Sequence, residues 1–103
     1  MAKLISIYWR DIPAQVIGRQ ARQKIKRELH PRFQAAIDRA AMRAGRGSSD
    51  AYLADWRRET EAVSGDLETL VEARAGELER RFPEEYLERI VKAGGRADGL
   101  VPG

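Results

Sequence analysis

The sequence contains no cysteine and a single histidine, His30. The absence of cysteine excludes disulfides, a thiolate nucleophile, and zinc or iron–sulfur sites built on Cys ligands. A catalytic triad or a histidine base would have to use His30. Because His30 precedes Pro31 at the expected start of a helix, we expect it to be a solvent-exposed cap, and we expect no metal site.

Long hydrophobic runs are also absent. No apolar stretch is nearly as long as a membrane span, which needs about 20 consecutive apolar residues. The apolar run over residues 4–9 is too short for the hydrophobic region of a signal peptide, and no small-residue cleavage site follows it. Glycine-rich phosphate loops and dinucleotide-binding fingerprints are missing, so we expect no cofactor. The sequence therefore predicts a cytoplasmic protein with no membrane partner.

What is present fits one small globular domain. The chain has 103 residues, of which 43% are hydrophobic and 34% charged, so it is not too polar to collapse. We expect a single domain over residues 1–95. Residues 96–103 are rich in glycine and are expected to form a flexible tail.

Charge is divided unevenly along the chain. Residues 1–47 hold eleven Lys and Arg against three acidic residues, a net charge of +8. Residues 48–103 hold eight Lys and Arg against thirteen acidic residues, a net charge of −5. This division indicates either an anionic partner or a fold in which the two halves attract each other. The sequence leaves both interpretations open.

The N-terminal segment predicts a β-strand over residues 3–9. β-branched and aromatic residues alternate there, which places Ile5, Ile7 and Trp9 on one face. Residues 10–13 end this strand, because proline at the end of the segment fixes its own φ and biases the residue before it toward extended geometry.

Two further strands are less clearly marked. Residues 14–17 are expected to close a hairpin, with Gly18 as a bulge or as the strand end, and a helix over residues 14–29 is the rival interpretation. Residues 19–28 are expected to run partly extended over the surface. A lone hairpin is only marginally stable, so we expect a third strand around residues 53–60. A helix beginning near residue 51 is the alternative there.

Three helices have clear apolar stripes and end signals. The first begins at Pro31 and ends before Gly45, the second spans residues 67–81, and the third begins after Pro83 and ends at Gly94. Together the elements predict an α+β fold. It consists of a small, mainly antiparallel sheet, built from an N-terminal hairpin and a third strand, covered by about three helices.

Aromatic and polar residues cluster at the hairpin and near residue 55, and Trp, Tyr and Arg dominate protein-binding hot spots. In so small a domain the aromatic residues are also candidates for the core. The candidate protein-interaction residues are Tyr8, Trp9, Arg10, Asp11, Gln15, Tyr52, Trp56 and Arg57. Asp11 is interpreted as a turn residue that binds nearby backbone amides. An enzyme that uses Asp11 and Arg10 as its polar groups is a further alternative.

A basic run follows the hairpin and forms a candidate surface for phosphate or nucleic acid. Its residues are Arg19, Arg22, Lys24, Lys26, Arg27 and Arg32. The run contains no aromatic residue on which a base could stack. A solvated face, or one that pairs with the acidic half of the chain, is the alternative.

Three segments resemble a known family. Residues 7–16 read IYWRDIPAQV, and residues 32–45 and 50–57 also match, so that the blocks cover most of residues 5–93. They are similar to a small bacterial "virulence factor" family, whose domain also occurs in proteins of the conserved virulence factor C type. The family has no assigned reaction. The resemblance implies an accessory protein whose partner is a component of one-carbon or corrinoid metabolism.

These observations favour a non-enzymatic accessory module that docks on another protein. A nucleic-acid-binding module that uses the basic segment 19–32 is the alternative.

Overall fold

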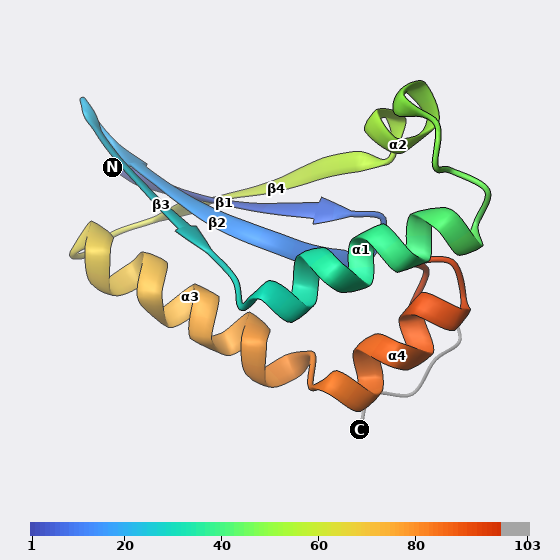
Figure 1. Cartoon of the computed structure of the whole chain (residues 1–103). Helices are drawn as coiled ribbons and strands as arrows, with labels where there is room; N and C mark the ends of the chain where they lie inside the picture. The colour runs from blue at the N-terminus through green and yellow to red at the C-terminus, as the bar shows by residue number, and fades with distance from the viewer. Residues whose placement is uncertain (98–103) are drawn as a thin grey trace.

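The computed structural model describes residues 1–97 and has an α+β fold, as the sequence predicts. In chain order the elements are β1 (Ala2–Trp9), β2 (Ile12–Gln20), β3 (Gln23–Glu28), α1 (Pro31–Arg43), α2 (Ser49–Ala54), β4 (Trp56–Val63), α3 (Leu67–Arg81) and α4 (Glu84–Lys92). The strands form one antiparallel sheet in the order β3-β2-β1-β4 (Figure 1). The N-terminal hairpin is therefore the centre of the sheet.

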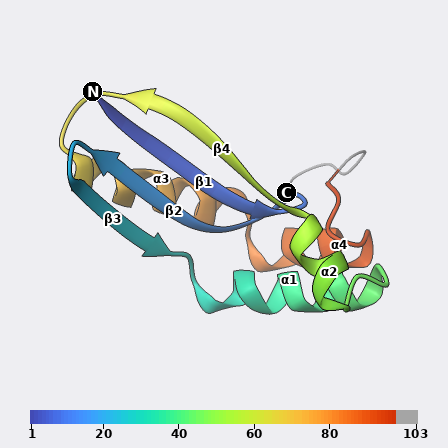
Figure 2. The same ribbon diagram turned by 90° about the horizontal axis from the view of Figure 1, so that it is seen from above.

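The helices are distributed unequally over the two sides of the sheet. In Figure 1, α1, α3 and α4 lie below the sheet and α2 lies above one end of it. α3 packs mainly under β2 and β3, whereas α1 packs against β2 and α4. Seen from above in Figure 2, most of the sheet surface has no helix in front of it. One face of the sheet is thus covered and the other is largely free.

The core lies between the sheet and its three larger helices. Its largest fully buried side chains include Trp9 and Ile12 of the hairpin, Phe33 and Ile37 of α1, and Ile90 of α4. Phe33, Ile37 and Ile90 lie on the apolar stripes from which the helices were predicted, and burial of these stripes stabilises the segments as helices.

Gly18 is neither a bulge nor a strand end, so this prediction is wrong. It lies within β2 opposite Leu4, and the bulge falls where β2 has one extra residue, Ala14. A Cβ atom at Gly18 would lie 2.5 Å from Val71 Cγ2 and 2.9 Å from Leu67 Cδ1. Glycine is needed at this position because α3 approaches the backbone of β2 so closely.

The basic segment, which was expected to run partly extended over the surface, forms a regular strand. Residues 23–28 pair with β2 as the edge strand β3, which makes four strands where three were predicted. The strand predicted around residues 53–60 is β4, which begins at Trp56. Residues 49–54 take the helical alternative, because the Ser48 side chain caps α2 by accepting from the Ala51 amide.

The predicted helix ends are confirmed. His30 is exposed, and its Nδ1 accepts a hydrogen bond from the Arg32 amide at 3.1 Å, which caps α1. The first residues of the expected tail are bound, since the Ala97 amide donates to Asp11 Oδ2 at 2.7 Å. The remainder of that expected tail, residues 98–103, lies outside the described residues.

Candidate functional site

A half-buried ionic network holds the β1–β2 turn. Arg10 has a left-handed backbone, with φ of 52°, and its Nε lies 3.0 Å from Asp55 Oδ2. Arg10 Nη1 donates to the Gly94 carbonyl at 2.9 Å, and Arg46 Nε donates to the same Asp55 oxygen at 2.9 Å. Burial raises the pKa of Asp55, but the hydrogen bonds and charges of the two arginines outweigh it and hold that pKa below its usual value. The network joins the hairpin, the end of α2 and the loop after α4.

The aromatic residues near this turn form a continuous cluster. Trp9 is fully buried, donates from Nε1 to the Tyr52 carbonyl at 2.9 Å, and stacks on the Tyr52 ring with centroids 6.0 Å apart. Tyr52 in turn meets Trp56 edge to face at 5.7 Å. Trp9 therefore makes no direct contact with solvent, while Tyr52 and Trp56 are half-buried.

Asp11 and Arg57 join the turn to β4 and to the end of the described chain. Arg57 Nη2 lies 3.3 Å from Asp11 Oδ1, while Asp11 Oδ2 accepts from Ala97. The Arg57 guanidinium also lies over the Tyr8 ring at 4.4 Å. Burial raises the pKa of Tyr8, and the negative charge of Glu59 raises it further. The positive charge of Arg57 offsets only part of this increase. Both Asp11 oxygens thus have partners within the fold, but these are the Arg57 guanidinium and an amide 86 residues along the chain, not the nearby backbone amides expected for a turn residue.

The structure divides the predicted basic surface in two. Arg27 points toward α3, where its Nε lies 3.2 Å from Glu72 Oε2 and its Nη1 lies 3.5 Å from Glu79 Oε2. Arg32 donates to the Glu79 carbonyl at 2.9 Å. These contacts support the interpretation that the basic and acidic halves attract each other. The other members of the basic run do not make such contacts with α3. Arg22 lies in the β2–β3 turn, and Arg19, Lys24 and Lys26 lie on the opposite face of the sheet.

That opposite face can be assigned from the strand register. Gly18 and Arg27 are directed toward α3, and side chains alternate along a strand, so their neighbours are directed away from it. Directly paired residues share a face. We call the resulting surface the open face; its residues are Lys3, Ile5, Ile7, Gln15, Ile17, Arg19, Lys24, Lys26, Glu28, Trp56, Arg58 and Thr60.

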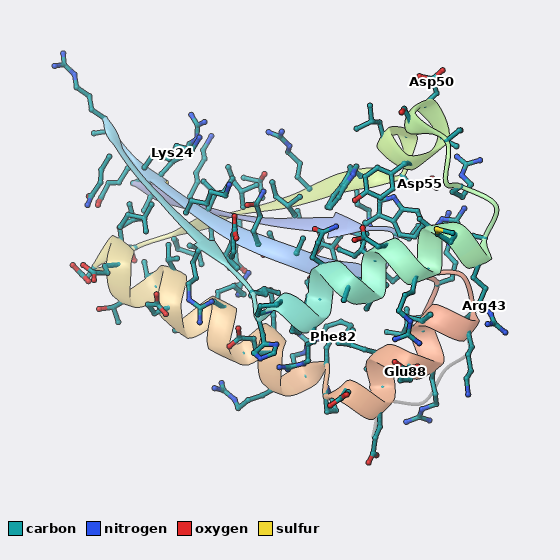
Figure 3. All side chains as sticks on the ribbon, viewed as in Figure 1. Lys24, Arg43, Asp50, Asp55, Phe82 and Glu88 are labelled. Carbon is teal, nitrogen blue, oxygen red and sulfur yellow. The ribbon has the colours of Figure 1, made fainter. Side chains whose placement is uncertain are left out.

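Cations dominate the open face. Arg19 is paired directly with Lys24 on one side and with Lys3 on the other, which places three positive charges in one row across the sheet. Lys24 lies on the side of the sheet away from α3 (Figure 3). Within residues 1–97, none of these three residues, nor Arg58, forms a salt bridge, whereas Lys26 has a partner in Glu28 at 3.5 Å. Like charges directly opposite each other destabilise a sheet, so an anionic partner bound to this row would relieve the repulsion.

Isoleucines lie beside this row of cations. Ile17 is paired with Ile5, and Ile7 follows on the same face of β1. Ile5 is only 8% exposed but does not belong to the continuous core, while Ile7 and Ile17 are half-buried. The open face thus has an apolar centre that none of the helices within residues 1–97 covers.

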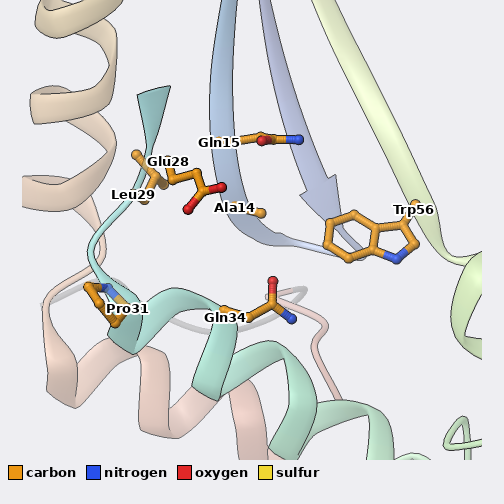
Figure 4. A pocket seen from close by; sticks show the side chains of 7 residues that line it. All are labelled: Ala14, Gln15, Glu28, Leu29, Pro31, Gln34 and Trp56. Atoms are coloured by element: carbon orange, nitrogen blue, oxygen red, sulfur yellow. The ribbon is translucent and has the colours of Figure 1, made fainter. Parts of the chain in front are cut away.

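A cavity of about 560 Å³ lies at the α1 end of the open face (Figure 4). Its lining residues are Ala14, Gln15, Glu28, Leu29, Pro31, Gln34 and Trp56. Two predicted interaction residues, Gln15 and Trp56, therefore meet here. Tyr8 and Arg57 lie on the α3 side of the sheet, so the structure does not bring the predicted set together on one surface.

Sequence reasoning missed Lys3, Arg58 and the isoleucines as site residues. The signal for Lys3, Ile5 and Ile7 was present, because alternation over residues 3–9 places them on one face, whereas Ile17 joins them through the pairing of β1 with β2. Arg58 could not be assigned in the same way, since β4 begins three residues later than the predicted strand.

Residues 1–97 contain no group of three or more His, Asp or Glu side chains that could hold a metal ion. No helix in this part of the chain combines the length and the apolar composition needed to cross a bilayer.

A family model described as "Virulence factor" matches residues 7–91, which is most of the chain. No curated protein and no solved structure matches.

Proposed function

The chain belongs to the Virulence factor family, and from this premise we propose that it is a non-enzymatic accessory module that binds another protein through its open face. The single observation that carries the proposal is the combination, on the face of the sheet opposite α3, of an apolar centre, Ile5, Ile7 and Ile17, with a row of cations that form no salt bridge within residues 1–97. Specific protein interfaces have this arrangement of an apolar core and a polar rim.

The edges of the sheet are poor alternatives to its face. β3 is a six-residue edge strand whose sequence, QKIKRE, is mostly charged. β4 carries Arg57, Arg58, Glu59 and Glu61. Charged, short edge strands resist pairing with another chain. The open face is therefore a better binding surface for a partner than either edge strand.

The predicted hairpin residues divide into two roles in this proposal. Gln15 and Trp56 line the cavity on the open face and contact the partner. Trp9, Arg10, Asp11 and Tyr52 fix the shape of that end of the sheet through the contacts described above. Tyr8 and Arg57, on the other side of the sheet, are outside the proposed contact surface.

The experiment is affinity purification of the tagged protein from its native cells, with partners quantified by mass spectrometry. The test variant is Arg19→Glu/Lys24→Glu, which removes the row of cations. The matched control is Arg43→Glu/Arg80→Glu, which changes two exposed arginines on α1 and α3 and alters the net charge equally. We expect one stoichiometric partner on the wild type and the control but not on the test variant, and the purified pair should reproduce this pattern. Identification of that partner also tests whether it is a component of one-carbon or corrinoid metabolism. A partner set unchanged by the test variant would reject the proposal.

Nucleic acid is the second candidate, favoured by the same three-cation row. Against it, Trp56 is the one aromatic side chain that the described part of the chain exposes on the open face, whereas single-stranded nucleic acid is commonly held by several stacking rings. Binding of a single-stranded oligonucleotide that weakens steeply with salt, and is lost in Arg19→Glu/Lys24→Glu, would support this candidate.

A further inference from the structure

We infer that the partner covers the open face with an acidic amphipathic helix. This inference rests on the proposed function and specifies the chemistry of the partner. It follows from the path of the apolar residues over the sheet, from the position of the cations beside that path, and from the cavity at its end.

The apolar residues form a diagonal path across three strands. Ile17 on β2 is paired with Ile5 on β1, and Ile7 is the next residue on the same face of β1. Trp56 on β4 is paired with Trp9, one step further along that face. The path therefore spans four residue steps along the strands, or roughly 14 Å at about 3.4 Å per residue, and two strand spacings of about 4.8 Å across them, which gives a diagonal of roughly 17 Å. An α-helix of about three turns has this length.

Charge is distributed unequally on the two sides of the path. Lys3 and Arg58 lie on one side, and Arg19 and Lys24 continue the row of Lys3 around the Ile17 end of the path; none of these four cations forms a salt bridge within residues 1–97. On the other side lie Gln15 and Glu28, at the cavity, where Glu28 neutralises Lys26. A complementary helix has Asp or Glu along one flank, neutral residues along the other, and apolar residues between them at positions i, i+3 or i+4, and i+7.

The cavity fits the end of such a helix. It opens on the same face as the apolar path, and its lining residues Trp56, Leu29 and Pro31 are apolar. A bulky apolar side chain from the helix can enter it, and large side chains seated in pockets contribute most of the energy of protein interfaces.

A second copy of this chain is a poorer occupant. A two-fold dimer through the open face would place Arg19, Lys24 and Lys3 of one copy against the same surface of the other. Like-charge contacts of this kind cost several kcal/mol. The occupant is therefore acidic, whereas this surface is basic.

The test uses synthetic helical peptides of about 18 residues as probes. The first has an apolar stripe with Glu on one flank. The second has Lys in place of Glu, and the third has the composition of the first with its apolar residues dispersed around the helix. A single-stranded oligonucleotide is the fourth probe. Binding is followed by NMR of isoleucine methyl groups, which compares Ile5, Ile7 and Ile17 on the open face with the core residues Ile12 and Ile37 as internal controls.

We expect the Glu-flanked peptide to shift the open-face methyl signals and to leave the core signals in place. Its affinity should fall about tenfold or more for Arg19→Glu/Lys24→Glu and remain unchanged for Arg43→Glu/Arg80→Glu. The Lys-flanked peptide should show the reverse preference. Thermal unfolding of each variant verifies that it is folded before binding is measured.

Three results would overturn the inference. One is equal binding of the dispersed peptide, which would mean that only net charge is recognised. Another is binding of the oligonucleotide with no binding of the Glu-flanked peptide. The third is the absence of peptide binding while the native partner still depends on Arg19 and Lys24; in that case the proposed function would stand and only the helical mode would fail.

Discussion

Arg10 and Asp55 are 45 residues apart in the sequence, and the Nε of the first lies 3.0 Å from Oδ2 of the second. Their side chains are only 15% and 14% exposed. Because Arg46 binds the same carboxylate and Arg10 also binds the Gly94 carbonyl, Asp55 is the common acceptor that holds three separate segments together.

Replacement of Asp55 by Ala should therefore destabilise the domain. It leaves two arginines without their anion in a half-buried site, and removal of one partner from such a site costs about 1 to 3 kcal/mol. Urea unfolding measures the loss. Asp38→Ala is the matched control, because Asp38 is exposed and accepts only from Gln34 on its own helix; its effect should stay within about 0.5 kcal/mol. Equal losses for the two variants would contradict the role assigned to Asp55.

Acid should remove the contribution of Asp55. Its pKa in the folded protein lies below the ordinary value, so the folded state binds this proton less readily than the unfolded state. The stabilisation is then fully present above about pH 4 to 5, where the unfolded carboxyl is ionised, and is lost as pH falls through the folded pKa. The free energy of unfolding of the wild type, minus that of Asp55→Asn, should be constant near neutral pH and shrink below about pH 4. A difference that grows with acid would show that the pKa is raised instead.

Gly18→Ala should destabilise the packing of α3 on the sheet. The added Cβ would lie 2.5 Å from Val71 Cγ2, so that α3 or the strand must shift, at a cost of about 1 to 3 kcal/mol. In a Val71→Ala background the same change should cost less, because the nearest atom is gone. Gly47→Ala is the control, since a Cβ there meets nothing within 4 Å. Additive effects of Gly18→Ala and Val71→Ala would refute the close approach.

The elements that the sequence predicted well are those with local signals. Apolar alternation predicted β1, and stripes with Pro, Gly or Asp at their ends predicted α1, α3 and α4. β3 was missed because its sequence contains one apolar residue, Ile25; its extended conformation comes from pairing with β2, a long-range effect that local propensity does not contain.

The candidate site was predictable only in part for a related reason. The basic run could be recognised from composition, but whether each cation points toward α3 or away from it depends on strand register. Arg27 and Lys26 are adjacent in the sequence, yet the first binds Glu72 of α3 and the second lies on the open face. Lys3 and Arg58 join the same surface only because β1 lies between β2 and β4.

Arg19→Thr should stabilise the isolated domain while it weakens partner binding. Arg19 is paired with Lys24 on one side and Lys3 on the other, and each like-charge pair opposes sheet formation by about 0.2 to 1 kcal/mol. Threonine also suits a strand, so the substitution removes repulsion without loss of β-propensity. We expect a higher free energy of unfolding at low salt, with a gain that shrinks as salt screens the wild-type charges.

Arg27→Thr gives the contrasting measurement on the neighbouring strand. Arg27 is paired with Glu72 and Glu79, so its removal should lower the free energy of unfolding instead of raising it. If both substitutions destabilised the domain equally, the cations of the open face would be structural, as Arg27 is. Suppose instead that Arg19→Thr alone raises the free energy of unfolding and also reduces partner binding. The repulsion among the cations of the open face then destabilises the free domain and is relieved when an anionic surface binds to them.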